Sequence, residues 1–283
     1  MSDFLAAVIQ HPFLQHALWA GALASLSCGV VGSLVVVRRM SYLAGAIAHS
    51  VLGGMGAARY LQVTQGWTWL TPLHGAVLAA LLAALIMGWV SLRAREREDT
   101  IIGALWAVGM AVGILFMAAT PGYSVDLMSY LFGNILMVTT TDLWLMAGLD
   151  ALVLAVGLGR YHQFLAVCFD EEFARVRGLR VDLYFLVLVG LTALTVVVLS
   201  AVVGIIMVIA LLTLPAAMAG RFAGRLWQIM AGAVFFSLVF TTLGLGISYG
   251  LDLPSGAFII VLIGAAYLVL ALATGRRGLW RPR

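Results

Sequence analysis

Apolar stretches long enough to cross a membrane, about 20 residues each, recur along almost the whole chain and constrain its fold more than any other feature. Inside a bilayer the backbone finds no water, so only helices and closed barrels satisfy its hydrogen bonds. Charged residues make up only 10% of the chain, against about a quarter in soluble domains. The sequence therefore predicts an all-α polytopic membrane protein, with residues 1–283 forming a single transmembrane domain.

About nine transmembrane helices are expected, and eight are possible because one boundary is weak. The stretch from Tyr184 to Ala219 is nearly unbroken, but one helix of about 36 residues would measure roughly 54 Å, too long for a core of about 30 Å. We therefore divide it near Ser200. The predicted spans are 15–37, 42–63, 73–92, 100–119, 142–161, 181–199, 201–219, 226–249 and 255–274.

The arginines indicate the orientation. All sixteen basic residues are arginines, and apart from Arg59 they follow the first, third, fifth, seventh and ninth spans. Arginine-rich loops stay in the cytoplasm, so the N-terminus is expected outside and the C-terminus in the cytoplasm. Such arginines also contact anionic membrane lipids, so no nucleic-acid partner is expected. No basic segment with a cleavage site precedes the first span, which we expect to be retained.

Residues 120–141 form the longest predicted outer segment. Pro121 and Gly122 end the fourth span, and the apolar run from Leu127 to Met137 is too short to cross a membrane. A re-entrant or interfacial segment is expected here. The sequence leaves no room for a large soluble domain, so active transport would require an ion gradient or a partner protein.

The longest predicted inner loop, 162–180, has the pattern of a short amphipathic helix. Phe169, Phe173 and Val176 recur at helical spacing, acidic residues precede them, and Gly178 suits a helix end. The helix could lie on the membrane surface or form a docking surface. The pattern Glu172-x-Ala174-x-x-x-Gly178 resembles the E-A-A-x-x-x-G coupling loop of bacterial ABC importer permeases, with Phe173 in place of the first alanine.

Four stretches together resemble the permease subunit of the metal-ion ABC importers, the ABC-3 family for zinc, manganese or iron. They read VVVRRMSYLAGAIAHSVLGG, DLMSYLFGNILMV, FDEEFARVRGLRV with VVGIIMVIALLTLPAAMA, and YGLDLPSGAFIIVL, and they occur in the family's order. The resemblance implies a type II ABC importer-like permease that pairs with a second copy in a bacterial or archaeal cytoplasmic (inner) membrane.

The resemblance also implies the partners. ATP would be bound and hydrolysed by a separate cytoplasmic ATP-binding subunit docked at Glu172, Ala174 and Gly178, and an extracytoplasmic metal-binding protein would deliver the ion. The permease itself would not be an enzyme and would hold no permanent cofactor, only the transported divalent metal ion.

Two polar residues lie deep in predicted spans. His49 lies roughly 10 Å from the inner end of the second span, and Asp150 roughly 12 Å from the outer end of the fifth. Imidazole and carboxylate suit zinc, manganese or iron, and polar groups in a membrane usually have a function. Alternatively, His49 bonds a neighbouring carbonyl in a tightly packed helix rich in small residues.

The second span departs from the family pattern at one position. Family members commonly read G-D-x-x-x-H there, but this chain has Gly45 four residues before His49. Either Asp150 compensates for the missing acid, or the metal is bound more loosely.

Other candidates carry two interpretations each. Asp252, in LDLPSG, is a turn residue or N-cap of the ninth helix, or a rim acid that binds incoming cations, and Asp126 in the outer segment allows the same pair. Pro215 is a simple kink or a gating hinge. Three histidines at the predicted outer edge could meet incoming metal: His11, His16 and His74.

Two transporter classes remain as alternatives. His49 and Asp150 could relay protons in a secondary transporter, although such a protein needs no docking helix. A permease for a metal chelate such as a siderophore shares the docking logic. No H-E-x-x-H, P-loop or G-x-S-x-G motif occurs in a plausible context, so an intramembrane enzyme is not expected.

Overall fold

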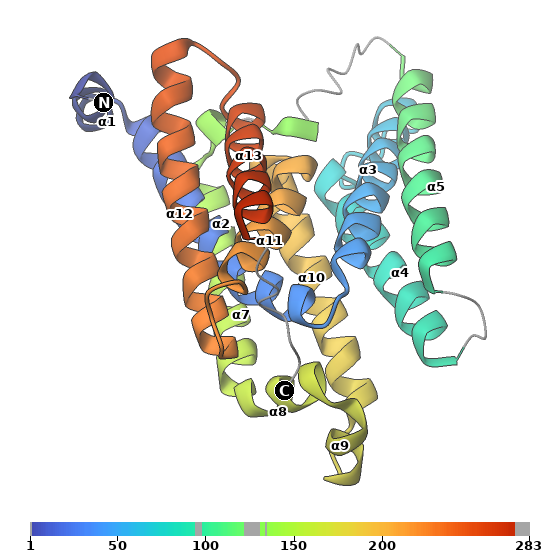
Figure 1. The fold of residues 1–283 in the computed structure, drawn as a ribbon. Coiled ribbons are helices and arrows are strands. Elements are labelled where there is room, and N and C mark those ends of the chain that lie inside the picture. Colours follow the sequence, from blue (N-terminus) through green and yellow to red (C-terminus); the bar gives the residue numbers. More distant parts are fainter. Residues whose placement is uncertain (1, 94–97, 122–130, 134, 275–283) are drawn as a thin grey trace.

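The structure, a computed structural model, describes residues 2–93, 98–121, 131–133 and 135–274. Within these ranges the chain forms helices and no strand (Figure 1). The elements are α1 (Ser2–Gln10), α2 (Pro12–Val37), α3 (Ser41–Thr64), α4 (Pro72–Arg93), α5 (Glu98–Ala119), the 3₁₀ helix η1 (Ile135–Met137), α7 (Thr140–Gly159), α8 (Tyr161–Phe169), α9 (Glu171–Val176), α10 (Val181–Val203), α11 (Ile205–Ala219), α12 (Leu226–Leu251) and α13 (Ser255–Thr274).

The predicted all-helical, multi-span membrane architecture is confirmed. Among the described residues, seven helices are long and apolar enough to cross a membrane, namely α2, α4, α5, α7, α10, α12 and α13. The two other predicted spans also form helices. α3 is 24 residues long but carries more polar residues, and α11 is apolar but only 15 residues long.

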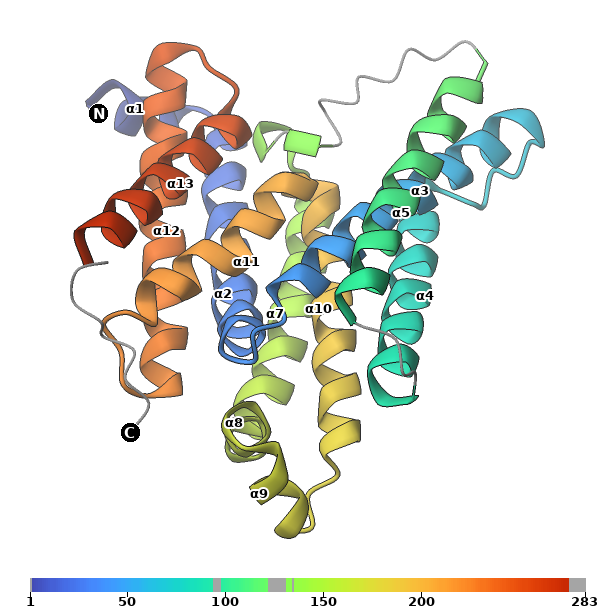
Figure 2. The ribbon, with the colours of Figure 1, turned by 45° about the vertical axis from the view of Figure 1, so that its right-hand side comes forward.

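The helices form two groups joined by α10. On one side α2 packs against α7, α11 and α12, and α13 packs against α11 and α12 (Figure 1). On the other side α3 lies between α4 and α5. Because α10 contacts both α2 and α4, it connects the groups. In Figure 2, α11 runs obliquely across the first group.

The helical structure is interrupted between α10 and α11 at Gly204, four residues after the predicted boundary. Gly204 has φ 86° and ψ 155°, a region of backbone conformation that is essentially restricted to glycine. Its α-carbon faces Gly133, which also has a positive φ of 67°. A Cβ on either glycine would collide with backbone atoms of the other segment, Phe132 and Gly133 or Val203 and Gly204. The break therefore depends on a backbone contact between distant parts of the chain.

Part of the outer segment lies outside the described residues, including Asp126 and much of the predicted short helix. What is described of it near α7 is Phe132, Gly133 and the 3₁₀ helix η1. Thr139 then caps α7, since its side chain accepts a hydrogen bond from the Asp142 backbone and Asp142 bonds the Thr139 backbone in return. This reciprocal cap defines where α7 starts.

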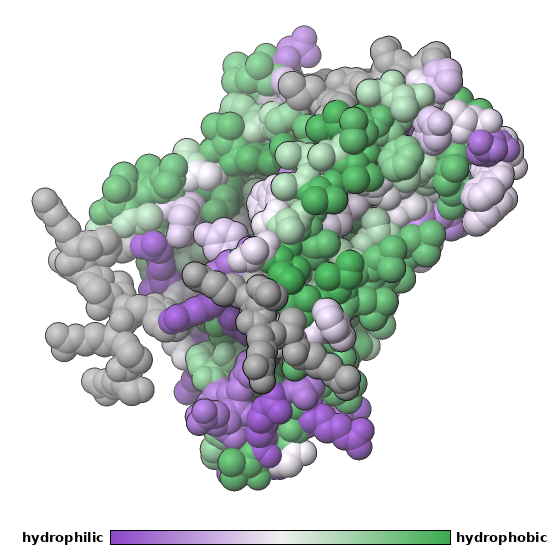
Figure 3. Space-filling model, turned by 90° about the vertical axis from the view of Figure 1, so that its right-hand side faces the viewer, coloured by the Kyte–Doolittle hydropathy of each residue, from purple (hydrophilic) through white to green (hydrophobic). Residues whose placement is uncertain are grey.

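The polar and apolar surfaces separate along the molecule. Figure 3 shows hydrophobic residues over most of one face and hydrophilic residues gathered at the lower end. α8 and α9 form that end, and α2 ends and α10 begins near it (Figure 1). The described arginines that follow α2, α7 and α9 belong to these helix ends. One end of the bundle thus carries the residues that the sequence assigns to the cytoplasm.

The glycine break yields a first prediction. Gly204→Ala should lower the free energy of unfolding of the detergent-solubilised protein by about 1–3 kcal/mol or more, and its melting temperature with it. The reason is that alanine disfavours this backbone conformation and its Cβ collides with the Gly133 segment. Gly190→Ala is the matched control, since Gly190 lies within α10 with no atom near its added Cβ. Alanine is there favoured by about 0.5–1 kcal/mol. Equal melting temperatures for the two variants would contradict the proposed role of the contact.

Candidate transport and docking sites

His49 lies in the middle of α3, on a helix that packs very closely against α5. A Cβ on Gly53 would lie 2.8 Å from the carbonyl oxygen of Gly109, and one on Gly56 would lie 2.7 Å from that of Gly113. The two backbones therefore meet directly, as small residues allow in membrane helices. This contact fixes the position of α5 over the residues that precede it on α3.

The imidazole of His49 stacks on Trp106 of α5. The ring centroids are 4.5 Å apart and the planes differ by 25°. His49 is only 8% exposed, and its Nδ1 is buried with no hydrogen-bond partner. Buried polar atoms are almost always bonded, so the unpartnered Nδ1 makes His49 a candidate ligand. The alternative that His49 bonds a neighbouring carbonyl finds no support at Nδ1.

Trp106 also occupies the space beside Gly45. A Cβ on Gly45 would collide with the indole ring, meeting Cζ3 and lying 2.9 Å from Cη2. The family resemblance implies an acid at position 45, and the space that such a side chain would enter is occupied by the indole of Trp106. The sequence does not single out Trp106, which is an indole three residues before Gly109 in an apolar span.

Asp150 lies on α7, buried against α2. It is 4% exposed, its Oδ1 accepts a hydrogen bond from the Ser27 hydroxyl, and its Oδ2 is buried without a partner. The described contacts of Asp150 thus lead to α2, whereas those of His49 lead to α5, and they do not join the two residues. Among the described residues no group of three or more His, Cys, Asp and Glu is placed to hold a metal ion.

The remaining candidates lie at helix ends or within α11. Asp252 is exposed and ends α12 in the left-handed conformation, with φ 55°. It therefore does not cap the last helix, which begins at Ser255. Pro215 is buried inside a continuous α11. His16 contacts the Val138 carbonyl at 3.3 Å, and His74 contacts the Thr71 hydroxyl at 2.7 Å. Both histidines thus have polar partners within the protein.

The predicted cytoplasmic helix has both of its expected ends. The Asp170 carboxylate accepts a hydrogen bond of 2.9 Å from the Phe173 backbone and caps α9. Gly178, with φ 78°, reverses the chain after it. The Leu179 backbone N–H then donates to the Ala174 carbonyl at 3.0 Å, which closes the helix C-terminus.

One face of α9 is anchored and the opposite face is open. Ala174 is fully buried against Val167 and Val181. Two large apolar side chains of α9 are exposed instead, with exposed fractions of 51% for Phe173 and 88% for Val176, and Phe169 at the end of α8 is 61% exposed. These exposed apolar side chains are available to a membrane surface or to a partner protein.

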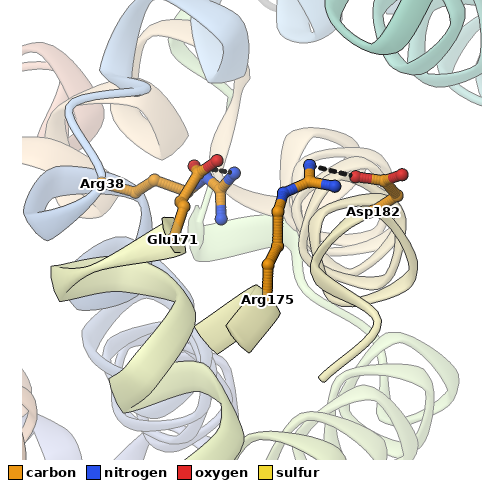
Figure 4. Close-up of polar contacts among 4 residues, drawn as sticks. All are labelled: Arg38, Glu171, Arg175 and Asp182. Atoms are coloured by element: carbon orange, nitrogen blue, oxygen red, sulfur yellow. Dashed lines mark hydrogen bonds and ion pairs between the residues drawn. The ribbon is translucent and has the colours of Figure 1, made fainter. Parts of the chain in front are cut away.

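Two ion pairs tie α9 to the membrane helices (Figure 4). Arg38, at the end of α2, bonds Glu171 at 2.6 Å, and Arg175 bonds Asp182, at the start of α10, also at 2.6 Å. The Arg38 guanidinium also lies 4.9 Å from the centroid of the Phe185 ring. Arg38 immediately precedes the tight turn into α3, where Arg39 has φ 61°. The pairs thus connect α9 to α10 and to the corner that leads to His49.

A groove of about 540 Å³ lies beside the same surface, between α8 and the start of α12. Its walls include Leu165, Phe169, Phe173 and Trp227. The Tyr161 hydroxyl accepts from the Trp227 backbone at 3.2 Å and joins the two walls. Nearby, burial raises the pKa of the Cys168 thiol to about 11, so this thiol stays protonated near neutral pH and is not a nucleophile.

The chain is similar to metal transport proteins over nearly its whole length. A model described as the ABC 3 transport family matches residues 10–274. An uncharacterized membrane protein of Synechocystis sp. is 44% identical over 95% of this chain and 93% of its own. The manganese transport system membrane protein MntC of Halalkalibacterium halodurans is 32% identical over 100% and 96%. PsaBC from Streptococcus pneumoniae, solved in complex with Fab, superposes with TM-score 0.83 and 31% identity over 95% of both chains.

The cap of α9 yields a second prediction. Asp170→Ala removes the side chain that bonds the Phe173 backbone, which costs a helix about 1 kcal/mol. Trypsin should then cleave after Arg175 and Arg177 several-fold faster, because α9 opens more often. Asp170→Asn keeps a capping oxygen and should be cleaved at about the wild-type rate. Equal rates for all three proteins in a gel-based digestion time course would show that Asp170 does not hold the helix.

Proposed function

This chain belongs to the ABC 3 transport family, and from this premise we propose that it is the membrane-spanning permease of an ATP-driven importer for a divalent transition-metal ion. The observation that carries the proposal is the similarity to manganese transport permeases over almost the entire chain. The permease moves the ion, and a separate subunit hydrolyses ATP. The cargo is zinc, manganese or iron, delivered by an extracytoplasmic binding protein.

The proposal also includes the orientation of the helices in the membrane. The N-terminus lies outside, the C-terminus lies in the cytoplasm, and α3 and α11 add to the seven apolar helices to give nine membrane segments. The arginines that follow α2, α7 and α9 support this orientation. The fold is that of a type II importer, and a second copy of the chain completes the pore. Large apolar side chains exposed on α5 and α13, such as Leu115 and Leu272, are available to lipid or to that second copy.

The transient metal site is centred on His49. Its buried, unpartnered Nδ1 supports a ligand role, since imidazole suits zinc and iron and binds manganese less well. Asp150 is the second candidate, because its buried Oδ2 is also unpartnered. Asp252, exposed at the outer turn between α12 and α13, is proposed to attract cations at the rim. Pro215 is proposed as a hinge for gating within α11.

The ATP-binding subunit docks on α9. Glu172, Ala174 and Gly178 make up the docking motif: Glu172 is exposed, Ala174 anchors the helix and Gly178 ends it. The exposed phenyl rings of Phe169 and Phe173 provide the apolar part of the contact. When the ATP-binding subunit moves α9, the ion pairs Arg38–Glu171 and Arg175–Asp182 carry the motion to α2 and α10.

The docking proposal makes a third prediction. Glu172→Arg, or deletion of residues 169–178, should abolish copurification of the ATP-binding subunit with the permease, because charge and apolar area are lost from the contact. Gln65→Arg, at the exposed end of α3 far from α9 in the bundle, introduces the same side chain at a distant position and should leave the complex intact. A complex that survives both docking variants would refute the proposal. Metal transport by the permease alone in proteoliposomes would instead favour a secondary transporter.

A fourth prediction concerns the ligands. At equal membrane abundance, His49→Ala and Asp150→Asn should each reduce ATP-dependent uptake of radioactive metal by at least about tenfold, since each removes a donor atom. The control Ser33→Ala removes a different buried polar group, a hydroxyl that donates to the Gly29 carbonyl of its own helix, and this variant should transport normally. Normal uptake by both ligand variants would eliminate these residues as the transport site.

A further inference from the structure

A charged cavity lies at the ends of the membrane helices, beside α9. Its volume is about 220 Å³, and pockets for drug-sized ligands begin at about 300 Å³, so it suits a small polar group. Its walls carry both ion pairs of Figure 4, Arg38 with Glu171 and Arg175 with Asp182. The cavity therefore presents two positive and two negative side chains, with no net charge.

These side chains keep hydrogen-bonding capacity beyond their ion pairs. A guanidinium has five N–H donors and a carboxylate has two acceptor oxygens, yet each pair joins one nitrogen to one oxygen. The Arg38 side chain is only 11% exposed, and among the described residues its buried Nη1 finds no hydrogen-bond partner. The other three side chains are about half exposed, so a ligand in the cavity can reach them. The cavity thus offers donors to an anion and acceptors to a cation at the same time.

The cavity lies at the level of lipid headgroups. α2 ends at Val37, α4 ends at Arg93 and α10 begins at Val181, and the cavity walls include Arg38, Leu92 and Val181 at these three ends. Each of these helices is long and apolar enough to cross a membrane. Their ends therefore mark the boundary between the hydrocarbon core and the headgroups.

An exposed apolar stripe on α4 leads to the cavity. Five exposed side chains recur on this helix at a spacing of three or four residues, namely Leu78, Leu82, Leu85, Trp89 and Leu92. The last of them, Leu92, also lines the cavity. α10 runs beside the stripe, because a Cβ on Gly88 would meet the side chain of Leu186, which is exposed as well. A lipid with its headgroup in the cavity can therefore rest its acyl chains on this face.

The charges of the cavity select among headgroups. A headgroup with only a phosphate would meet the two arginines but would also lie close to two carboxylates that repel it. A phosphoethanolamine headgroup carries a phosphate and an ammonium, so both of its charges find partners of opposite sign. Hydrogen bonds between such charged groups are the strong ones. The ammonium donates three of them, whereas the trimethylammonium of phosphocholine donates none.

We propose that this cavity binds the headgroup of a phosphatidylethanolamine lipid, with the phosphate on Arg38 and Arg175 and the ammonium on Glu171 and Asp182. The bound lipid bridges the two ion pairs and so ties α9 more firmly to the ends of α2 and α10. The lipid site itself stands on the cavity and its charges, whereas its effect on transport rests on the proposed function.

Lipid retention tests the site directly. The full-length permease is purified in detergent, incubated with dioleoyl phosphatidylethanolamine, phosphatidylcholine or phosphatidylglycerol, and analysed by native mass spectrometry. The ethanolamine lipid should bind at least about tenfold more tightly than the choline lipid, since one hydrogen bond to a charged group is worth roughly that factor. Equal retention of the three lipids would overturn the proposal.

Isosteric variants should change which lipid is preferred. Glu171→Gln/Asp182→Asn removes both negative charges, so the two remaining arginines should favour the anionic phosphatidylglycerol over phosphatidylethanolamine. Glu172→Gln is the matched control, because it removes a carboxylate from the same helix at a residue outside the cavity wall, and it should keep the wild-type order. An unchanged order of lipids in the double variant would overturn the assignment of the ammonium to these carboxylates.

A competition experiment distinguishes a lipid from a free anion. Inorganic phosphate at the concentration of the lipid should displace little phosphatidylethanolamine, because it has neither the ammonium nor the acyl chains. Complete displacement would assign the cavity to free phosphate and overturn the lipid site.

Transport separates this inference from the proposed function. The permease, its ATP-binding subunit and its binding protein are reconstituted in phosphatidylcholine vesicles with or without phosphatidylethanolamine, and ATP-dependent uptake of Mn²⁺ and Zn²⁺ is measured. Wild-type uptake should be several-fold faster with the ethanolamine lipid. In Glu171→Gln/Asp182→Asn the ratio of the two rates should fall towards one, although the broken ion pairs lower both rates.

The outcomes are distinguishable. A general effect of the lipid on the bilayer would give wild type and the double variant the same ratio, which would overturn the role of the site in transport. If wild type shows no ATP-dependent uptake in either kind of vesicle, the proposed function fails, and lipid retention by the purified permease still decides whether the lipid site exists.

Discussion

The direct backbone contact between α3 and α5 is the constraint on which the candidate transport site depends. In a membrane, apolar helices gain little from hiding from lipid, so close packing of small residues is what holds two helices in register. Here Gly53 and Gly56 meet Gly109 and Gly113, and this register delivers Trp106 to His49. Larger residues at these glycines would separate the helices and leave the histidine without its neighbour. The chemistry at the site therefore follows from packing a turn or two away.

Much of the fold follows from the sequence because length and apolarity are local properties. The predicted spans are helices in the structure, and the weak boundary near Ser200 resolves four residues later at Gly204. The shift has a physical reason, since the break is specified by a glycine conformation and by a contact with Gly133. Neither is visible in a pattern of apolar residues. The capped helix at Asp170 was predictable, because caps are short-range signals.

The partners of the candidate site residues were not predictable, because they depend on which helix faces meet. A helix that is apolar all round has no periodic pattern to indicate which face meets which neighbour. The sequence therefore identified His49 and Asp150 as unusual residues in apolar spans, but not their partners. The structure supplies Trp106 for the first and Ser27 for the second. It also shows that Asp252 ends α12 and does not cap the start of α13. The left-handed backbone conformation of Asp252 itself ends the helix there.

The two ion pairs around α9 have a mechanical consequence. The helix has six residues, so it is only about 9 Å long, and it is held near its first residue through Glu171 and near its last through Arg175. A rod that short does not bend appreciably. If the ATP-binding subunit docks on its open face as proposed, a push there would be passed on to α2 through Glu171 and to α10 through Arg175. Because α10 contacts both helix groups, a displacement of α9 would then act on both.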